Sequence, residues 1–140
     1  MSTEKIIGRG AYGGVAEGIA LVVPDSIQGW AGIDDRTGII IERDNSHTGE
    51  CIHGKILVLP CAKGSNGWSS HFHAAKVCGI SPVGWIFTKM DSRCGVGATV
   101  MKIPTVADFT DVNPCEFIHD GDYVRINGQT GEVEILHRAE

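Results

Sequence analysis

The chain has 140 residues, of which 42% are apolar and 21% charged, and this composition is typical of one globular domain with one hydrophobic core. Its 17 acidic and 12 basic residues give a net charge of −5, and no two lysines or arginines are adjacent, which argues against a surface for nucleic acid or for an anionic membrane. The first residues contain no apolar stretch long enough for a secretory signal or a membrane span, so we expect a cytoplasmic protein.

The first predicted elements are strands. Residues 16–23 are rich in Ile, Leu and Val and end at Pro24, which predicts a strand closed by a turn. The run of three isoleucines at 39–41 predicts a second strand, buried on both faces. Residues 55–60, 83–88 and 104–107 are short continuous apolar runs, which predict three parallel strands.

Helices are expected between these parallel strands. Apolar residues recur at helical spacing over 68–79, with Gly79 as the stop signal, and a weaker helical pattern covers 96–103. The chain then ends in a predicted hairpin: a strand at 123–126, a turn at 127–131 and a strand at 132–136. The sequence therefore predicts an α/β fold in which a β layer packs on a small βαβαβ layer, as a single domain over residues 1–140.

The five cysteines do not form a recognisable ligand set. They are separated by 10 to 21 residues, without a C-x-x-C motif, and are Cys51, Cys61, Cys78, Cys94 and Cys115. This spacing argues against a disulfide framework and against a metal or iron–sulfur site within this chain. We therefore expect no bound metal here and interpret the cysteines as buried thiols.

The histidines also fail as a metal site. On a helix, His71 and His73 would lie about 200° apart around the axis, so their side chains could not bind the same metal ion. The remaining four histidines are expected to be surface or structurally satisfied side chains; they are His47, His53, His119 and His137.

The most informative segment follows the predicted strand that ends at Pro60. Residues 61–67 read Cys-Ala-Lys-Gly-Ser-Asn-Gly and lead into the predicted helix. A glycine-rich turn before a helix presents unpaired N–H groups, which favour a carboxylate or a phosphate. The segment lacks the P-loop pattern, and Ser65 or Asn66 could simply cap the helix. The residues thus leave two interpretations open, an anion site and a structural cap.

Several motifs together resemble the small subunit of the aconitase X family. They are Gly8-Arg9-Gly10, Gly14 to Gly18, Gly32-Ile33-Asp34, Gly54 to Pro60 followed by Lys63-Gly64-Ser65, and Ile103-Pro104. The resemblance implies a swivelling β/β/α domain like the mobile domain of aconitase. It also implies a large partner subunit that holds an iron–sulfur cluster, while this chain binds none.

The resemblance further implies a catalytic role for the turn. Ser65 would be the base that removes a proton α to a carboxylate, while a β-hydroxyl leaves as water with the partner's iron as Lewis acid. The substrate-binding residues would be Lys63, Gly64, Asn66 and Gly67. Aconitase has an arginine where Gly67 stands, so the positive contact would come from Lys63, from backbone N–H groups or from the partner.

The expected substrate is a small anionic hydroxy acid. Family members dehydrate cis-3-hydroxy-L-proline or mevalonate 5-phosphate, and we expect the first, with the second as the alternative. The chain alone would then be inactive, because it holds no cluster.

Two other functions remain open. The segment 70–75 and the closing hairpin are similar to the phosphohistidine swivelling domain of phosphoenolpyruvate-utilising enzymes, in which His71 or His73 would carry a phosphoryl group. If Ser65 is only a helix cap, the chain could instead be a non-catalytic regulatory subunit.

Overall fold

The computed structural model describes residues 4–24, 26–27, 33–34, 36–42, 45–61, 76–77, 79–90, 92–109 and 112–139. Its strands are β1 (Glu4–Ile7), β2 (Arg9–Tyr12), β3 (Val15–Val22), β4 (Ile56–Leu59), β5 (Gly84–Phe87), β6 (Thr105–Ala107), β7 (Tyr123–Asn127) and β8 (Glu132–His137). The two helices with defined bounds are α2 (Ser92–Met101) and α3 (Pro114–Phe117). Among the described residues, we find no helix with the length and apolar character that crossing a membrane requires.

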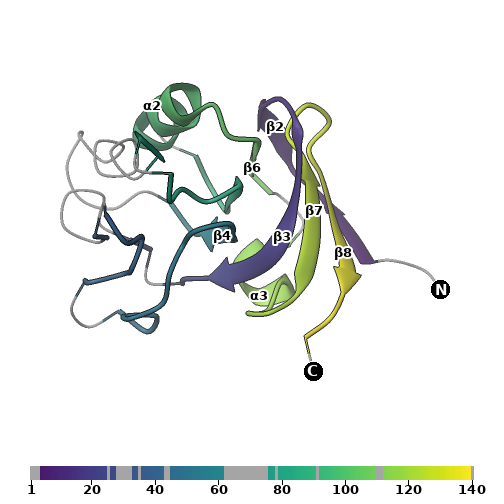
Figure 1. Cartoon of the computed structure of the whole chain (residues 1–140). Coiled ribbons are helices and arrows are strands. Elements are labelled where there is room, and N and C mark those ends of the chain that lie inside the picture. Colours follow the sequence, from purple (N-terminus) through teal and green to yellow (C-terminus); the bar gives the residue numbers. More distant parts are fainter. Residues whose placement is uncertain are drawn as a thin grey trace.

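The eight strands form one sheet in the order β1-β8-β7-β3-β4-β5-β6-β2. β1, β8, β7 and β3 pair antiparallel, whereas β3, β4, β5 and β6 run parallel, so β3 belongs to both halves. Figure 1 shows the β7–β8 hairpin on one side of β3, with β4 and α2 on the other. The long strand β3 therefore joins an antiparallel half to a parallel half.

The sheet curls until its two edge strands meet. β1 and β2 stand at opposite ends of the strand order, yet only Gly8 separates them in the chain. The Gly8 N–H donates to the carbonyl of Gly131 at 2.8 Å, and the Gly128 N–H donates to the carbonyl of Gly14 at 2.7 Å. These contacts tie the turn between β7 and β8 to the chain around β2, so the curled sheet is closed at this point.

Each half buries its strands in the way expected for its pairing. All four residues of β4 and all four of β5 are buried, because both faces of the parallel half are covered. In β7 and β8 buried and half-buried residues alternate, because one face of the antiparallel half is open to solvent.

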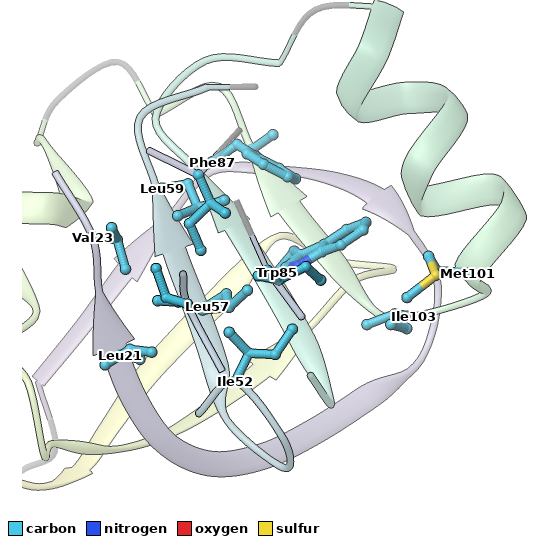
Figure 2. Close-up of a cluster of buried hydrophobic side chains, with 13 residues drawn as sticks. Leu21, Val23, Ile52, Leu57, Leu59, Trp85, Phe87, Met101 and Ile103 are labelled. Carbon is cyan, nitrogen blue, oxygen red and sulfur yellow. The ribbon is translucent and has the colours of Figure 1, made fainter. Parts of the chain in front are cut away.

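The core has two parts, one on each face of the parallel half. Inside the curl, side chains of both halves meet, including Ile56, Ile86, Val124 and Val133. On the outer face the core contains Leu57, Leu59, Trp85 and Phe87, together with Met101 of α2 and isoleucines of the 27–52 region. Figure 2 shows this outer cluster, in which Leu57 and Trp85 come from neighbouring strands.

Several predicted elements are confirmed. The strands predicted at 16–23, 55–60, 83–88 and 104–107 are β3, β4, β5 and β6, and the last three are parallel as expected. The hairpin is β7 and β8, and the weak helical pattern at 96–103 is α2, which begins four residues earlier. Of the residues in the helix predicted at 68–79, the structure describes only 76, 77 and 79. Residues 76–77 are helical, and residue 79 lies in a turn.

Other predictions are wrong. Residues 39–41 form only isolated bridges and no strand, and Ile40 alone is buried, while Ile39 and Ile41 are 36% and 52% exposed. The predicted packing of a β layer on a small α/β layer is confirmed only in part, because both parts are present but form two halves of one continuous sheet, joined by β3. β1, β2 and the one-turn helix α3 were not expected; Asn113 caps α3 by accepting a hydrogen bond from the Cys115 N–H at 3.0 Å.

Candidate functional site

The carboxyl ends of the four parallel strands lie together at one edge of the sheet. β3, β4, β5 and β6 are parallel neighbours, so the residues that follow them emerge at the same edge. These residues include Pro24, Cys61, Lys89 and Asp108. In α/β sheets, ligands bind outside the carboxyl ends of parallel strands. We call this region the carboxyl edge and treat it as the candidate functional site.

The site residues expected from the sequence belong to the segment 62–75, which begins at this edge directly after Cys61. That segment lies outside the described residues, and with it the predicted catalytic Ser65, the predicted ligands Lys63, Gly64, Asn66 and Gly67, and the alternative phosphocarriers His71 and His73. Their roles remain predictions.

The end of β4 is bonded firmly to the end of β5. The Thr88 N–H donates to the carbonyl of Leu59 at 3.0 Å, and the Lys89 N–H donates to the carbonyl of Pro60 at 3.0 Å. These two bonds extend the pairing beyond the strands themselves. The chain is therefore held in register up to the residue before Cys61.

Cys61 is fixed from the other side by Ser26. The Ser26 hydroxyl donates to the carbonyl of Cys61, and the Ser26 N–H donates to the carbonyl of Val23 at 2.9 Å. Ser26 is 3% exposed and has a φ of 60°, a conformation that non-glycine residues rarely adopt. Its own carbonyl accepts a hydrogen bond from Asn45 at 2.8 Å. Buried hydrogen bonds thus set the point where the 62–75 segment begins.

The Gly8-Arg9-Gly10 motif places an arginine at the carboxyl edge. A Cβ atom on Gly8 would lie 2.8 Å from the carbonyl oxygen of Ala107, and one on Gly10 would overlap the carbonyl oxygen of Gly128. Both glycines are needed because the neighbouring backbone approaches so closely. Between them, Arg9 lies opposite Ala107, the last residue of β6.

Arg9 forms an ion pair with Asp108. The shortest distance, from Arg9 Nη2 to Asp108 Oδ2, is 2.6 Å, while Asp108 Oδ1 accepts the Met90 N–H at 2.8 Å. Asp108 has a φ of 58°, in the left-handed region that few non-glycine residues adopt. Partial burial opposes its ionisation, but the hydrogen bonds from Met90 and Arg9 outweigh burial and lower the pKa of Asp108. Asp108 is therefore ionised and fixed at neutral pH.

A hollow of about 480 Å³ opens beside this ion pair, between the ends of β5 and β6. It is lined by Thr88, Lys89, Met90, Asp108 and Phe109. The Lys89 side chain is exposed and has no ion-pair partner among the residues that the structure describes. The volume falls within the range of small-molecule sites.

A smaller hollow of about 230 Å³ lies at the same edge near β3 and α3, with His47, Cys115 and Asp120 in its wall. His47 Nε2 lies 2.6 Å from Asp120 Oδ2, so the prediction of a structurally satisfied histidine is confirmed for His47. Burial raises the pKa of the Cys115 thiol, which keeps it protonated and poorly nucleophilic.

The described residues offer no set of ligands for a metal or cluster. No group of three or more His, Cys, Asp or Glu side chains converges in this part of the chain. Cys51, Cys61 and Cys115 are free and only partly buried, so the prediction of buried thiols is wrong for these three. The side chains within the described ranges do not suit an iron–sulfur cluster.

Sequence reasoning missed three residues of the site. Arg9 belongs to the Gly8-Arg9-Gly10 motif, but the sequence analysis assigned it no role in the site. No sequence pattern marks Lys89 or Asp108 as a site residue, since each is a single charged residue after a short apolar strand. The pairing of β2, β5 and β6 brings them together.

Comparison with known proteins places the chain in a family. Residues 5–135 match the family model described as aconitase X swivel domain. Phosphomevalonate dehydratase small subunits from Methanosarcina mazei and Methanosarcina acetivorans are 38% and 37% identical over 97% and 94% of this chain, and 94% and 91% of their own length. The crystal structure of Thermococcus kodakaraensis aconitase X in its holo form superposes with a TM-score of 0.88 at 34% identity, covering 96% of this chain and 99% of that one. The chain belongs to the aconitase X swivel domain family.

Proposed function

We propose that this chain is the small subunit of an aconitase X-type dehydratase, which together with a large subunit removes water from mevalonate 5-phosphate. One observation carries the proposal: the similarity to phosphomevalonate dehydratase small subunits runs over 97% of this chain and 94% of the Methanosarcina mazei protein. This similarity favours mevalonate 5-phosphate over cis-3-hydroxy-L-proline, the substrate first expected from the sequence. Hydroxyproline becomes the alternative.

In this proposal Ser65 is the base. The C–H bond next to the substrate carboxylate breaks, and its electron pair forms the C=C bond. The C–O bond on the neighbouring carbon breaks, and the departing hydroxyl takes up a proton from an acid of the large subunit or from solvent and leaves as water. Ser65 accepts the proton, which requires a seryl oxygen stabilised as an anion by surrounding N–H groups with water excluded. The Gly-rich sequence around Ser65 would supply such backbone donors.

The described geometry supports a fixed origin for this segment. Ser26 binds the carbonyl of Cys61, and Lys89 binds the carbonyl of Pro60, so the chain leaves β4 from a defined position. A catalytic group on the following turn would gain precision from such an anchor, because small displacements of a reacting group slow a reaction strongly.

The iron–sulfur cluster belongs to the large subunit in this proposal. Among the described residues no side-chain set suits it. The large subunit would also close the carboxyl edge against water, which explains why a swivelling chain needs a partner for activity.

The test is an assay of the assembled two-subunit enzyme with each substrate in turn. We expect turnover of mevalonate 5-phosphate and little of cis-3-hydroxy-L-proline. Ser65→Ala should lower kcat by roughly 10²- to 10⁴-fold while subunit association and melting temperature stay nearly unchanged. Ser81→Ala, a serine near the amino end of β5, is the matched control and should retain full activity.

Three results would contradict the proposal. Near-normal turnover by Ser65→Ala would remove Ser65 as the base, and a modest loss that follows a lowered melting temperature would assign it to a helix cap. Loss of activity only in His71→Ala or His73→Ala would favour the phosphocarrier alternative.

A further inference from the structure

The hollow between the ends of β5 and β6 lies at the carboxyl edge, where β4 also ends and leads through Cys61 into the segment 62–75. β5 is the direct neighbour of β4, and β6 follows it. Neighbouring strands are about 5 Å apart, so this hollow lies roughly one to two strand spacings from the end of β4. A ligand of modest length can therefore extend from one place to the other.

The charges in this hollow favour an anion. Asp108 and Lys89 line the hollow with one negative and one positive charge, and Arg9, which pairs with Asp108, adds a second positive charge beside it. The two oxygens of Asp108 are already engaged, one by Arg9 and one by the Met90 N–H. Lys89 is close enough to help lower the pKa of Asp108, which burial tends to raise. Because Arg9 neutralises Asp108, Lys89 is left as the uncompensated cation among the described groups at this hollow.

The backbone that carries Lys89 and Arg9 is fixed in place. The Lys89 backbone is bonded to Pro60, and Arg9 is held between two glycines that the neighbouring backbone requires. A fixed backbone limits the positions that the Lys89 ammonium group can reach. The apolar part of the wall, Met90 and Phe109, suits the carbon chain of a ligand rather than a free ion.

We propose that this hollow is the subsite for the phosphate group of the substrate, with Lys89 as its ligand and the Arg9–Asp108 pair as a positioning element. The inference rests on the proposed function, in which the substrate carries a carboxylate at one end and a phosphate at the other. The carboxylate must lie at the base, because the proton removed is on the adjacent carbon. The phosphate then lies away from the base, where a lysine acts as a point charge for it.

The experiment uses the assembled two-subunit enzyme and two readouts. The first is the dissociation constant of inorganic phosphate, measured by calorimetry; the second is kcat/KM for mevalonate 5-phosphate. Lys89→Gln should weaken phosphate binding and lower kcat/KM by about 10- to 100-fold, as expected for a lost hydrogen bond to a charged group. Arg9→Gln should weaken phosphate binding too, because Asp108 then faces the phosphate without its partner.

Matched controls separate the site from a general loss of charge. Lys102→Gln removes an exposed lysine at the amino end of β6, and Arg125→Gln removes an arginine paired with Glu17 on the antiparallel half. Both controls should bind phosphate as the wild type does. Phosphate affinity unchanged in Lys89→Gln, or lowered equally in Lys102→Gln, would overturn the subsite. Weaker subunit association in Lys89→Gln with unchanged phosphate affinity would assign Lys89 to the subunit interface instead.

The two readouts also separate this inference from the proposed function. If the wild-type enzyme does not turn over mevalonate 5-phosphate, the proposed function fails, and the phosphate affinities still decide the subsite. If turnover is normal and Lys89→Gln changes neither readout, the subsite fails and the proposed function stands.

Discussion

Replacing Gly128 by alanine should open the closure of the curled sheet. A Cβ atom at Gly128 would overlap the carbonyl oxygen of Tyr12 and lie 2.8 Å from the Tyr12 carbonyl carbon and 3.0 Å from the Thr105 nitrogen. All three atoms belong to the backbone, so no side-chain rotation relieves the overlap. The shift also threatens the hydrogen bond from the Gly128 N–H to Gly14.

The expected loss of stability combines these two effects. Overpacking costs about 1–3 kcal/mol and one weakened backbone hydrogen bond costs about 1 kcal/mol, so the free energy of unfolding should fall by roughly 2–4 kcal/mol. For a domain of this length, that corresponds to a melting temperature lower by about 10 °C. Thermal and urea unfolding of the purified chain, followed by circular dichroism, measure both quantities.

Gly13→Ala is the matched control. No atom lies within 4 Å of a Cβ placed on Gly13, and its φ is not in the left-handed region. Alanine there should leave the stability unchanged or raise it by up to about 1 kcal/mol, because it restricts the unfolded chain. Equal effects at both positions would refute the reasoning, since backbone overlap would then not decide the outcome.

Three further predictions concern the buried charge, the core and the isolated chain. Burial tends to raise the pKa of Asp122, but hydrogen bonds from two backbone N–H groups and Arg138 outweigh it and lower the pKa. The contribution of Asp122 to stability is therefore present above the unfolded pKa of about 3.9 and is lost as the pH falls through the lower folded pKa. Asp122→Asn should lower the melting temperature at pH 7, and the melting temperature of this variant should fall less than that of the wild type between pH 5 and pH 2. An equal fall in both proteins would contradict this. In urea unfolding, Leu57→Ala should lower the free energy of unfolding by about 2–5 kcal/mol and Ile41→Ala by less than about 1 kcal/mol, because Leu57 is 0% and Ile41 52% exposed. Similar losses for the two variants would count against the assigned core. The chain without its large subunit should show no dehydratase turnover of mevalonate 5-phosphate, whereas robust turnover would place the whole active site in this chain.

The continuous apolar runs could be read correctly from the sequence because burial on both faces leaves a strong local signal. Residues 56–59 and 84–87 contain no charged side chain, as parallel strands with two covered faces require. The closing hairpin was equally clear, because the turn Asn127 to Gly131 lies between two alternating strands. The turn around Ser65, inferred from its glycine content and its place after a strand, lies outside the described residues and stays a prediction.

The isoleucines at 39–41 show where local reasoning fails. Three β-branched residues favour extended structure, but a strand needs a partner, and β3 already pairs with β7 on one side and β4 on the other. Ile40 instead packs on the outer core, while Ile39 and Ile41 are partly exposed. Within the described ranges, the segment makes only single bridges, Ile40 with Ile33 and Ile39 with Cys51, so no ladder forms.

The sequence by itself determined the parallel strands, the closing hairpin and the family, because each depends on residues close together in the chain. The catalytic turn around Ser65 stays a prediction. Only the tertiary structure decided that β3 joins both halves, that β1 and β2 close the sheet, and that Arg9, Lys89 and Asp108 share one edge. Arg9 and Asp108 are 99 residues apart in the chain. Their meeting depends on strand pairing over long sequence separations, and such pairing leaves no periodic pattern for local reasoning to detect.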